Sequence, residues 1–126
     1  MHVINIKPLK AYTDNYIWLL ETNEEVSVVD PGDAKPVLDY LSKTNKNLRD
    51  IFITHHHFDH TAGVPELENI ISGSIYGPKN SYELINEKVT QGDTLSSLGI
   101  KFEIIEVPGH TLDHIAFYNE ENNILF

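Results

Sequence analysis

The feature that most restricts the fold is a continuous apolar run, Ile51-Phe52-Ile53, followed at once by the polar segment THHHFDH at 54–60. Consecutive apolar residues without polar alternation are typical of a strand covered on both faces, so we expect a buried strand at 49–54. Four of the seven histidines of the chain lie at positions 54–60, directly after this apolar run. The sequence thus predicts a group of chemically active side chains at the end of a buried strand.

Other short runs of β-favouring residues predict the rest of the sheets. We expect strands at 2–6, 15–22, 25–30, 101–107, 114–119 and 123–126. Val26 and Val28 alternate with polar neighbours, which predicts a half-buried strand. Phe102 and Ile104 show the same alternation and lead to the same expectation for their strand.

Two helices are expected between these strands. Asp33 is a suitable N-cap, and Pro36 falls in the first turn of the helix that would follow it. A second helix is expected to begin near Thr61 and to bury Val64 and Leu67. Strands that alternate with helices predict a layered α/β domain.

Length, charge and cysteine content narrow the class of protein. The chain has 126 residues, which suits one domain, and it has no cysteine, so cysteine-ligated zinc and a thiolate nucleophile are excluded. Nine basic and nineteen acidic residues give a net charge of −10, which disfavours nucleic acid as a partner. No apolar run is long enough to cross a bilayer, and no secretory signal begins the chain. We expect a cytoplasmic monomer.

The histidines have the spacing of a metal site. Side chains alternate along an extended chain, so His55 and His57 point the same way, about 6.5–7 Å apart. His110 also follows a predicted strand and is the natural third imidazole. Three neutral imidazoles leave a position open for water, as in catalytic zinc sites. Asp59 and His60 suggest a second metal beside the first, and this donor set without sulfur suits zinc, iron or manganese.

Three other residues have two interpretations each. His56 points opposite to its neighbours and is expected to face solvent or to support the site without binding the metal. His114 begins an apolar strand, so it either packs in the fold or orients a ligand. Asp30 closes the strand EVSVVD and precedes a turn, so it either forms the turn or holds a ligand histidine in place. A surface tract rich in histidine, without a metal, is the alternative for the whole cluster.

The motif His-x-His-x-Asp-His at 55–60 resembles the signature of the metallo-β-lactamase superfamily. More narrowly, TDNY at 13–16, VDPG at 29–32, THHHFDHTAG at 54–63 and PGHTLDHIAFY at 108–118 resemble glyoxalase II, the family of hydroxyacylglutathione hydrolases. The resemblance runs along essentially the whole chain. It implies an αββα sandwich with a dinuclear metal site at one end of the two sheets.

The resemblance also assigns residues to that site. His55, His57 and His110 match the ligands of the first metal. Asp59 and His60 match two ligands of the second metal and are the expected catalytic residues. Asp30 matches the first motif of the superfamily, an aspartate that supports the site. Two zinc ions are implied for the intact enzyme, with iron or manganese as alternatives.

The implied reaction is hydrolysis of S-2-hydroxyacylglutathione, typically S-lactoylglutathione, to the hydroxy acid and glutathione, a step of methylglyoxal detoxification. Metal-activated water would attack the thioester carbonyl, so no serine or cysteine nucleophile is needed. The alternatives are a persulfide dioxygenase, a β-lactamase-like hydrolase, or a fragment that binds metal without catalysis.

The chain departs from the glyoxalase II pattern in two places. Asp113 stands where the family usually has glycine. The bridging aspartate of the family follows a strand like NNILF in a GDTLF segment, and this sequence contains no such segment after NNILF. Gly92-Asp93-Thr94-Leu95 is similar but precedes His110, so we interpret it as a turn. We therefore expect residues 1–126 to be a catalytic domain truncated at its C-terminus, without the glutathione-binding helical domain.

Overall fold

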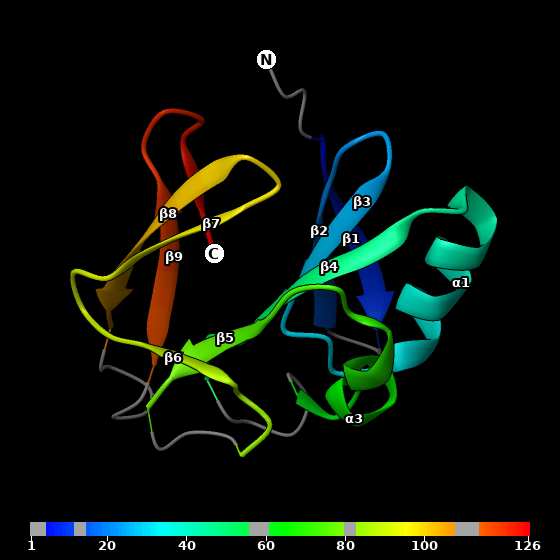
Figure 1. The fold of residues 1–126 in the computed structure, drawn as a ribbon, viewed down its shortest axis with the longest axis horizontal. Coiled ribbons are helices and arrows are strands. Elements are labelled where there is room, and N and C mark those ends of the chain that lie inside the picture. Colours follow the sequence, from blue (N-terminus) through cyan, green and yellow to red (C-terminus); the bar gives the residue numbers. More distant parts are fainter. Residues whose placement is uncertain (1–4, 12–14, 56–60, 80–82, 108–113) are drawn as a thin grey trace.

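The computed structural model describes residues 5–11, 15–55, 61–79, 83–107 and 114–126, which form two β-sheets with helices beside one of them (Figure 1). The first sheet has the order β1-β2-β3-β4-β5-β6 and the second the order β10-β9-β8-β7. The strands of the first sheet are β1 (Asn5–Ala11), β2 (Asn15–Glu21), β3 (Glu25–Val29), β4 (Asn47–Phe52), β5 (Ile75–Pro78) and β6 (Glu87–Val89). Those of the second are β7 (Thr94–Ser97), β8 (Ile100–Glu106), β9 (Ile115–Asn119) and β10 (Ile124–Leu125).

Strand β4 lies at the centre of the molecule, as the apolar run predicts. It pairs in parallel with β3 and β5, and Ile51, Phe52 and Ile53 are all fully buried. Ile51 and Ile53 belong to the apolar core on the helical side of the first sheet. Phe52 faces the second sheet and stacks on Phe117 of β9, with ring centroids 4.8 Å apart. One strand therefore joins both layers of the core.

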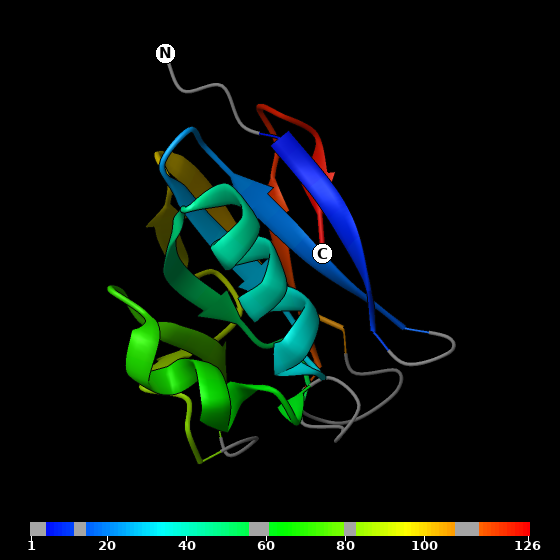
Figure 2. The same ribbon diagram turned by 90° about the vertical axis from the view of Figure 1, so that its right-hand side faces the viewer.

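Both predicted helices are present on the outer side of the first sheet, the side that faces the viewer in Figure 2. Helix α1 (Ala34–Thr44) begins after Asp33, whose carboxylate accepts a hydrogen bond from the Lys35 N–H at 3.1 Å. Helix α3 (Val64–Leu67) buries its first and last residues and continues into the 3-10 turn η1 (Glu68–Ile70). In the described residues no helix covers the outer face of the second sheet, so three of the four layers of an αββα sandwich are present.

A buried carboxylate attaches α1 to the sheet. Glu21 at the end of β2 is 1% exposed. It accepts hydrogen bonds from the Tyr40 hydroxyl and from the ammonium groups of Lys7 and Lys46, the latter two at 2.9 Å. Burial by itself raises the pKa of Glu21, but the hydrogen bonds from these three donors outweigh it and lower the pKa below its usual value.

Several expectations about the strands need correction. The described part of the first strand runs on to Ala11, because Pro8, which lacks an N–H, is tolerated on an edge strand. Strands β5, β6 and β7 were not predicted. They are short, and β5 contains Gly77 and Pro78, residues that normally disfavour strands. The segment Gly92-Asp93 forms the expected turn, but the two residues after it begin β7.

The half-buried strand predicted from Val26 and Val28 is also wrong, whereas the alternation in β8 is confirmed. Ser27 between the two valines is fully buried, because a polar network satisfies its hydroxyl. That hydroxyl lies 2.7 Å from the Ser97 hydroxyl of β7, and Ser97 donates to the Asp50 carboxylate of β4 at 2.6 Å. The Ser74 N–H donates to the other Asp50 oxygen at 2.8 Å. These bonds link the two sheets through their shared interior.

No helix in the described residues is both long enough and apolar enough to span a membrane.

Candidate metal site

The site is built at the ends of two neighbouring parallel strands. Asp30 follows β3 and Thr54 follows β4, so both lie at the same edge of the first sheet. The backbone of Asp30 has a φ of 51°, a left-handed conformation that Asp adopts more readily than most residues. Its N–H donates to the Phe52 carbonyl at 2.8 Å, which holds the turn against β4.

Both oxygens of the Asp30 carboxylate bind Thr54. Oδ1 accepts the Thr54 backbone N–H at 2.8 Å, and Oδ2 accepts the Thr54 hydroxyl at 2.6 Å. The same hydroxyl oxygen lies 2.8 Å from Nδ1 of His55. All three residues are buried, and His55 is only 5% exposed. A carboxylate, a hydroxyl and an imidazole are thus joined in one chain of hydrogen bonds.

The second sheet reaches this chain through the residues before β9. The Ile115 N–H donates to the Thr54 carbonyl at 3.0 Å, so the start of β9 is bonded directly to the end of β4. This bond brings the His114 ring against the His55 ring, with centroids 4.6 Å apart and planes inclined by 36°. The Val107 N–H donates to the His114 carbonyl at 2.9 Å. Val107 and His114, the described residues on either side of residues 108–113, are therefore bonded to each other, and His114 lies beside His55.

The described residues after the other histidine-rich segment are also bonded to the turn that contains Asp30. The segment leaves the described chain at His55 and re-enters it at Thr61. The Gly63 N–H donates to the Pro31 carbonyl at 2.8 Å, which ties the return of the segment to the turn that contains Asp30. An added Cβ at Gly63 would lie 2.5 Å from that carbonyl oxygen, so only glycine allows this close approach.

A groove between the sheets opens at these residues. Its volume is about 630 Å³, and Asp30, Thr54, His55 and His114 line its polar end. Side chains and backbone from β1, β2, β3 and the last five residues form the rest of the lining: Ile6, Trp18, Val29, Asn122, Asn123, Ile124, Leu125 and Phe126. Trp18 is 41% exposed and Leu125 64% exposed. The groove therefore joins a polar site to an apolar wall.

Of the predicted metal ligands, the structure describes His55 alone. His57, Asp59, His60 and His110 lie outside the described residues, as does His56. Within the ranges that are described, no three metal-binding side chains gather at one point. The described part nevertheless suits a metal, because the ring of a metal-binding histidine is usually oriented by a hydrogen bond to its other nitrogen. The buried His55 ring has such a contact with the Thr54 hydroxyl, which is itself bonded to Asp30. Asp30 and His114, each given two interpretations from the sequence, both lie beside His55.

Thr54 is the residue that the sequence interpretation missed. It stands directly before the first histidine and would ordinarily be counted as a strand residue. The sequence signal for Thr54 was its position directly before His55. Its second partner, Asp30, lies 24 positions earlier, and only the pairing of β3 with β4 brings Asp30 next to the Thr54 hydroxyl.

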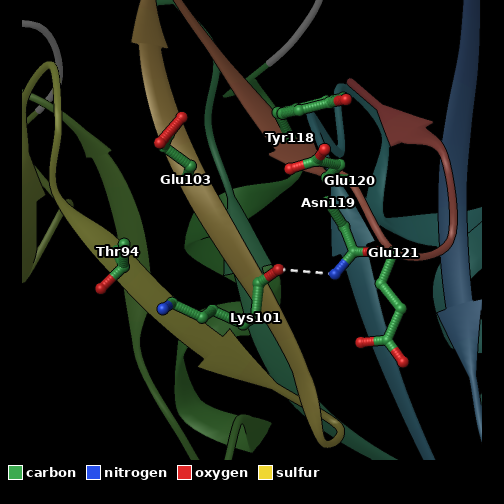
Figure 3. Close-up of a pocket in the computed structure, with 7 residues that line it drawn as sticks. All are labelled: Thr94, Lys101, Glu103, Tyr118, Asn119, Glu120 and Glu121. Atoms are coloured by element: carbon green, nitrogen blue, oxygen red, sulfur yellow. Dashed lines mark hydrogen bonds between the residues drawn. The ribbon is translucent and has the colours of Figure 1, made fainter.

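A second hollow of about 520 Å³ lies on the outer face of the second sheet. It is lined by Thr94, Lys101, Glu103, Tyr118, Asn119, Glu120 and Glu121 (Figure 3). The Asn119 amide donates to the Lys101 carbonyl at 2.7 Å. Figure 3 shows the glutamates spread along the sheet and not turned toward one point, so this hollow does not have the form of a metal site.

Comparisons with known proteins agree with this arrangement. The sequence model described as "Metallo-beta-lactamase superfamily" matches residues 13–126. A hydroxyacylglutathione hydrolase from Pseudoalteromonas translucida (strain TAC 125) is 48% identical over 126 residues, which cover 94% of this chain and 48% of that protein. One from Ectopseudomonas mendocina (strain ymp) is 45% identical over 128 residues, with 98% and 49% covered. The chain spans about half the length of the curated relatives it matches.

Solved structures show the same fold. The B3 metallo-beta-lactamase BLEG-1 superimposes with a TM-score of 0.84 at 19% identity, covering 97% of this chain and 70% of that one. ETHE1 from Myxococcus xanthus superimposes with a TM-score of 0.74 at 24% identity, covering 93% and 53%. At such identities the likeness concerns the fold alone, and it confirms the layered sandwich expected from the sequence.

Proposed function

Because the chain belongs to the metallo-beta-lactamase superfamily, we propose that it is the N-terminal half of a hydroxyacylglutathione hydrolase. The reaction would convert S-2-hydroxyacylglutathione thioesters, such as S-lactoylglutathione, to the hydroxy acid and glutathione. Identity of 48% and 45% to two enzymes of that name supports this activity over that of the other members of the superfamily. The structural observation that supports the proposal is that the described residues which flank both histidine-rich segments, His55, Gly63 and His114, are bonded to or packed against Asp30, Thr54 and the turn after Asp30.

Membership of the superfamily implies metal binding, and we propose zinc. In this proposal His55, His57 and His110 hold one ion, while Asp59 and His60 contribute to a second and to catalysis. When bound, such ions supply an acidified water and polarise the thioester carbonyl. The chain has no cysteine, so the hydrolysis does not depend on a thiolate nucleophile of the protein.

The residues around His55 have distinct tasks in this proposal. Asp30 and Thr54 hold the imidazole in one orientation, which spares the site a reorganisation when the substrate binds. His114 packs against the same ring and limits its rotation. The wall that contains Trp18 gives the groove an apolar side, against which the apolar part of a bound substrate could lie.

We also propose that residues 1–126 are followed by a further region in the longer protein, which supplies the bridging aspartate and the glutathione-binding helical domain. Two observations support this. The curated relatives are about twice as long as the matched region. In addition, three apolar side chains that line the groove, Ile6, Trp18 and Leu125, are at least 40% exposed, and such patches usually bind another surface. The cytoplasmic location, the monomeric state and a role in methylglyoxal detoxification stay predictions.

The proposed activity is tested by measuring hydrolysis of S-lactoylglutathione by the longer protein, with metal content from elemental analysis. His57→Ala is expected to lose metal and at least about 100-fold in activity, more than the loss typical of a residue that only supports a ligand. His56→Ala is the matched control and should keep its metal, because its side chain is expected to point away from the site. Turnover of glutathione persulfide without thioester hydrolysis would instead assign the protein to the persulfide dioxygenases.

The 126-residue chain tests the division between the two halves. Only two ligands of the second metal are present in its sequence, so we expect substoichiometric metal and very poor hydrolysis. Two tightly held metals per chain together with full turnover would contradict the proposed role of the following region.

A further inference from the structure

We propose that Ser27, Asp50 and Ser97 are positioning residues that together decide which side of β4 faces the second sheet. Three hydrogen bonds join them in a closed ring, called the polar ring below. The Asp50 N–H donates to the Ser27 hydroxyl at 3.3 Å, the two serine hydroxyls lie 2.7 Å apart, and Ser97 donates to the Asp50 carboxylate at 2.6 Å. The polar ring starts and ends on one residue, so it closes only when β3, β4 and β7 are all in place.

Strand β4 needs such residues because its apolar pattern does not fix its register. In most strands of a two-layered fold, one apolar face and one polar face set the register, since a shift of one residue would exchange the two faces. Ile51, Phe52 and Ile53 are apolar without interruption, and all three are fully buried. Burial of apolar area therefore discriminates only weakly between the two ways in which β4 could face the second sheet.

The pairing of β3 with β4 is irregular at the polar ring. Between two regularly paired positions, β3 has the single residue Ser27, whereas β4 has two residues, Arg49 and Asp50. Such a bulge reverses the alternation of side chains beyond it. Leu48 and Ile51, three positions apart, accordingly belong to the same apolar core on the helical side, although a regular strand would place them on opposite faces. The faces taken by the end of β4 are therefore set at this bulge.

Asp50 connects the polar ring to the candidate site. Its carboxylate bonds to Ser97 of the second sheet, so its side chain faces that sheet. Phe52 and Thr54 follow at intervals of two and face the same way. Phe52 stacks on Phe117 of β9, and Thr54 lines the groove. An Asp50 side chain held toward the second sheet thus places both Phe52 and Thr54 on the side where they are found.

The surroundings of Asp50 are built around its carboxylate. Each residue of the polar ring is at most 3% exposed. The Ser74 N–H, directly before β5, donates to the other carboxylate oxygen at 2.8 Å. An added Cβ at Gly73 would overlap that same oxygen, so glycine makes room for it. A buried carboxylate is costly without such donors, and Asp50 is therefore stable inside the fold only in this one arrangement.

A simpler interpretation is that the polar ring only satisfies polar groups that are buried for other reasons. Loss of the serine hydroxyls would then lower the stability but leave the same side of β4 facing the second sheet. The proposed role predicts instead that β4 populates both orientations once the polar ring is opened. The orientation of β4, and not the stability, distinguishes the two interpretations.

The experiment is NMR of the 126-residue chain, with the contact between the Phe52 and Phe117 rings as the signal for the orientation of β4. The double serine variant, Ser27→Ala/Ser97→Ala, opens the polar ring. We expect a second set of signals in this variant, in which the Phe52–Phe117 contact is absent and Ile53 contacts Phe117 instead. That exchange follows because a shift of one residue turns every side chain of the strand to the other face.

Two variants serve as controls. Asp50→Asn has the shape of the wild type, and its amide can accept from the Ser74 N–H and donate to Ser97, so we expect the wild-type contact. Val37→Ala removes apolar area from the other core, away from the polar ring. It should lower the stability and keep the orientation of β4.

Hydrogen exchange of the Ile115 N–H gives a second measurement, because this group is bonded to the Thr54 carbonyl at the end of β4. We expect it to exchange at least about 10-fold faster in the double serine variant than in Val37→Ala, with the two brought to the same global stability by urea. An effect of stability alone would give equal rates and would contradict the proposed role.

An unchanged Phe52–Phe117 contact in the double serine variant would overturn the proposal. So would a wild type without that contact, or an equal loss of it in Val37→Ala, because the contact would then follow stability alone. If the double serine variant does not fold, Ser27→Ala and Ser97→Ala are measured singly and decide in the same way. No metal or substrate enters these measurements, so their outcome is independent of the proposed hydrolase activity.

Discussion

Gly63 offers the sharpest test of how the site is assembled, because it is required for space and not for backbone freedom. Its φ of −84° and ψ of −12° are ordinary for any residue. An added Cβ, however, would lie 2.5 Å from the Pro31 oxygen, 2.6 Å from the Ala34 nitrogen and 2.7 Å from the Asp33 carbonyl carbon. All three are backbone atoms, so no rotamer change can relieve the contact. In Gly63→Ala the turn after Asp30 and the segment before α3 must move apart by about 1 Å to reach ordinary contact distance.

The cost has two parts. Overpacking at a site that cannot relax costs about 1–3 kcal/mol. Separation of the segments also lengthens the bond from the Gly63 N–H to the Pro31 carbonyl, which contributes about 0.5–1.5 kcal/mol. Together these give a loss of roughly 2–4 kcal/mol, or about 8–16 °C in melting temperature for a chain of this size. Because Asp30 precedes the displaced turn, zinc affinity should fall as well.

Gly92→Ala is the comparison. That residue has open space around it but a φ of 89°, so it should lose about 1–2 kcal/mol from strain alone and keep its zinc affinity, since it does not line the groove. Urea unfolding and chelator competition would be measured for both variants. If Gly63→Ala keeps the stability and the zinc affinity of the wild type, the turn after Asp30 and the segment before α3 do not approach each other as described, and their contact does not assemble the site.

Two further predictions concern buried carboxylates. Folding lowers the pKa of Glu21, so the contribution of its carboxylate to stability is complete above about pH 4.3 and is lost as the pH falls through the lower pKa of the folded state. Glu21→Gln should remove that pH dependence of the free energy of unfolding, measured in urea. Glu24→Gln, on an exposed turn, should leave it unchanged. Ser97→Ala deprives the buried Asp50 of a donor and should cost about 1–3 kcal/mol, against almost nothing for the exposed neighbour Ser96→Ala. Equal effects of Ser97→Ala and Ser96→Ala would show that the bond between the sheets contributes nothing.

The central strand and both helices could be predicted because their signals are local. The apolar run Ile51-Phe52-Ile53 by itself indicated a strand that is covered on both faces. Asp33 caps its helix through a hydrogen bond to Lys35, only two positions away. The alternation in β8 also predicted its burial. Motif spacing led to the family and hence to the sandwich, which the fold comparisons confirm.

The errors came from features that depend on distant residues. Ser27 lies between two valines and looks like an exposed position, yet it is buried because Ser97, seventy positions later, supplies its hydrogen bond. Strand β6 has only three residues and exists because β5 provides the backbone partners. Residue propensities over a short stretch of sequence cannot predict the burial of Ser27 or the presence of β6, because the residues that stabilise them lie elsewhere in the chain.

The same dependence explains why Thr54 was overlooked and why the site lies where it does. Asp30 and Thr54 are 24 positions apart and meet because β3 and β4 are parallel neighbours that end at the same edge. His55 and His114 meet because the Ile115 N–H donates to Thr54 across the two sheets. Thr54 thus takes part in both connections, through its side chain in one and its carbonyl in the other. A residue that joins two sheets and orients a histidine can change only if both connections are kept, and serine is the one substitution that retains the hydroxyl and the backbone bonds together.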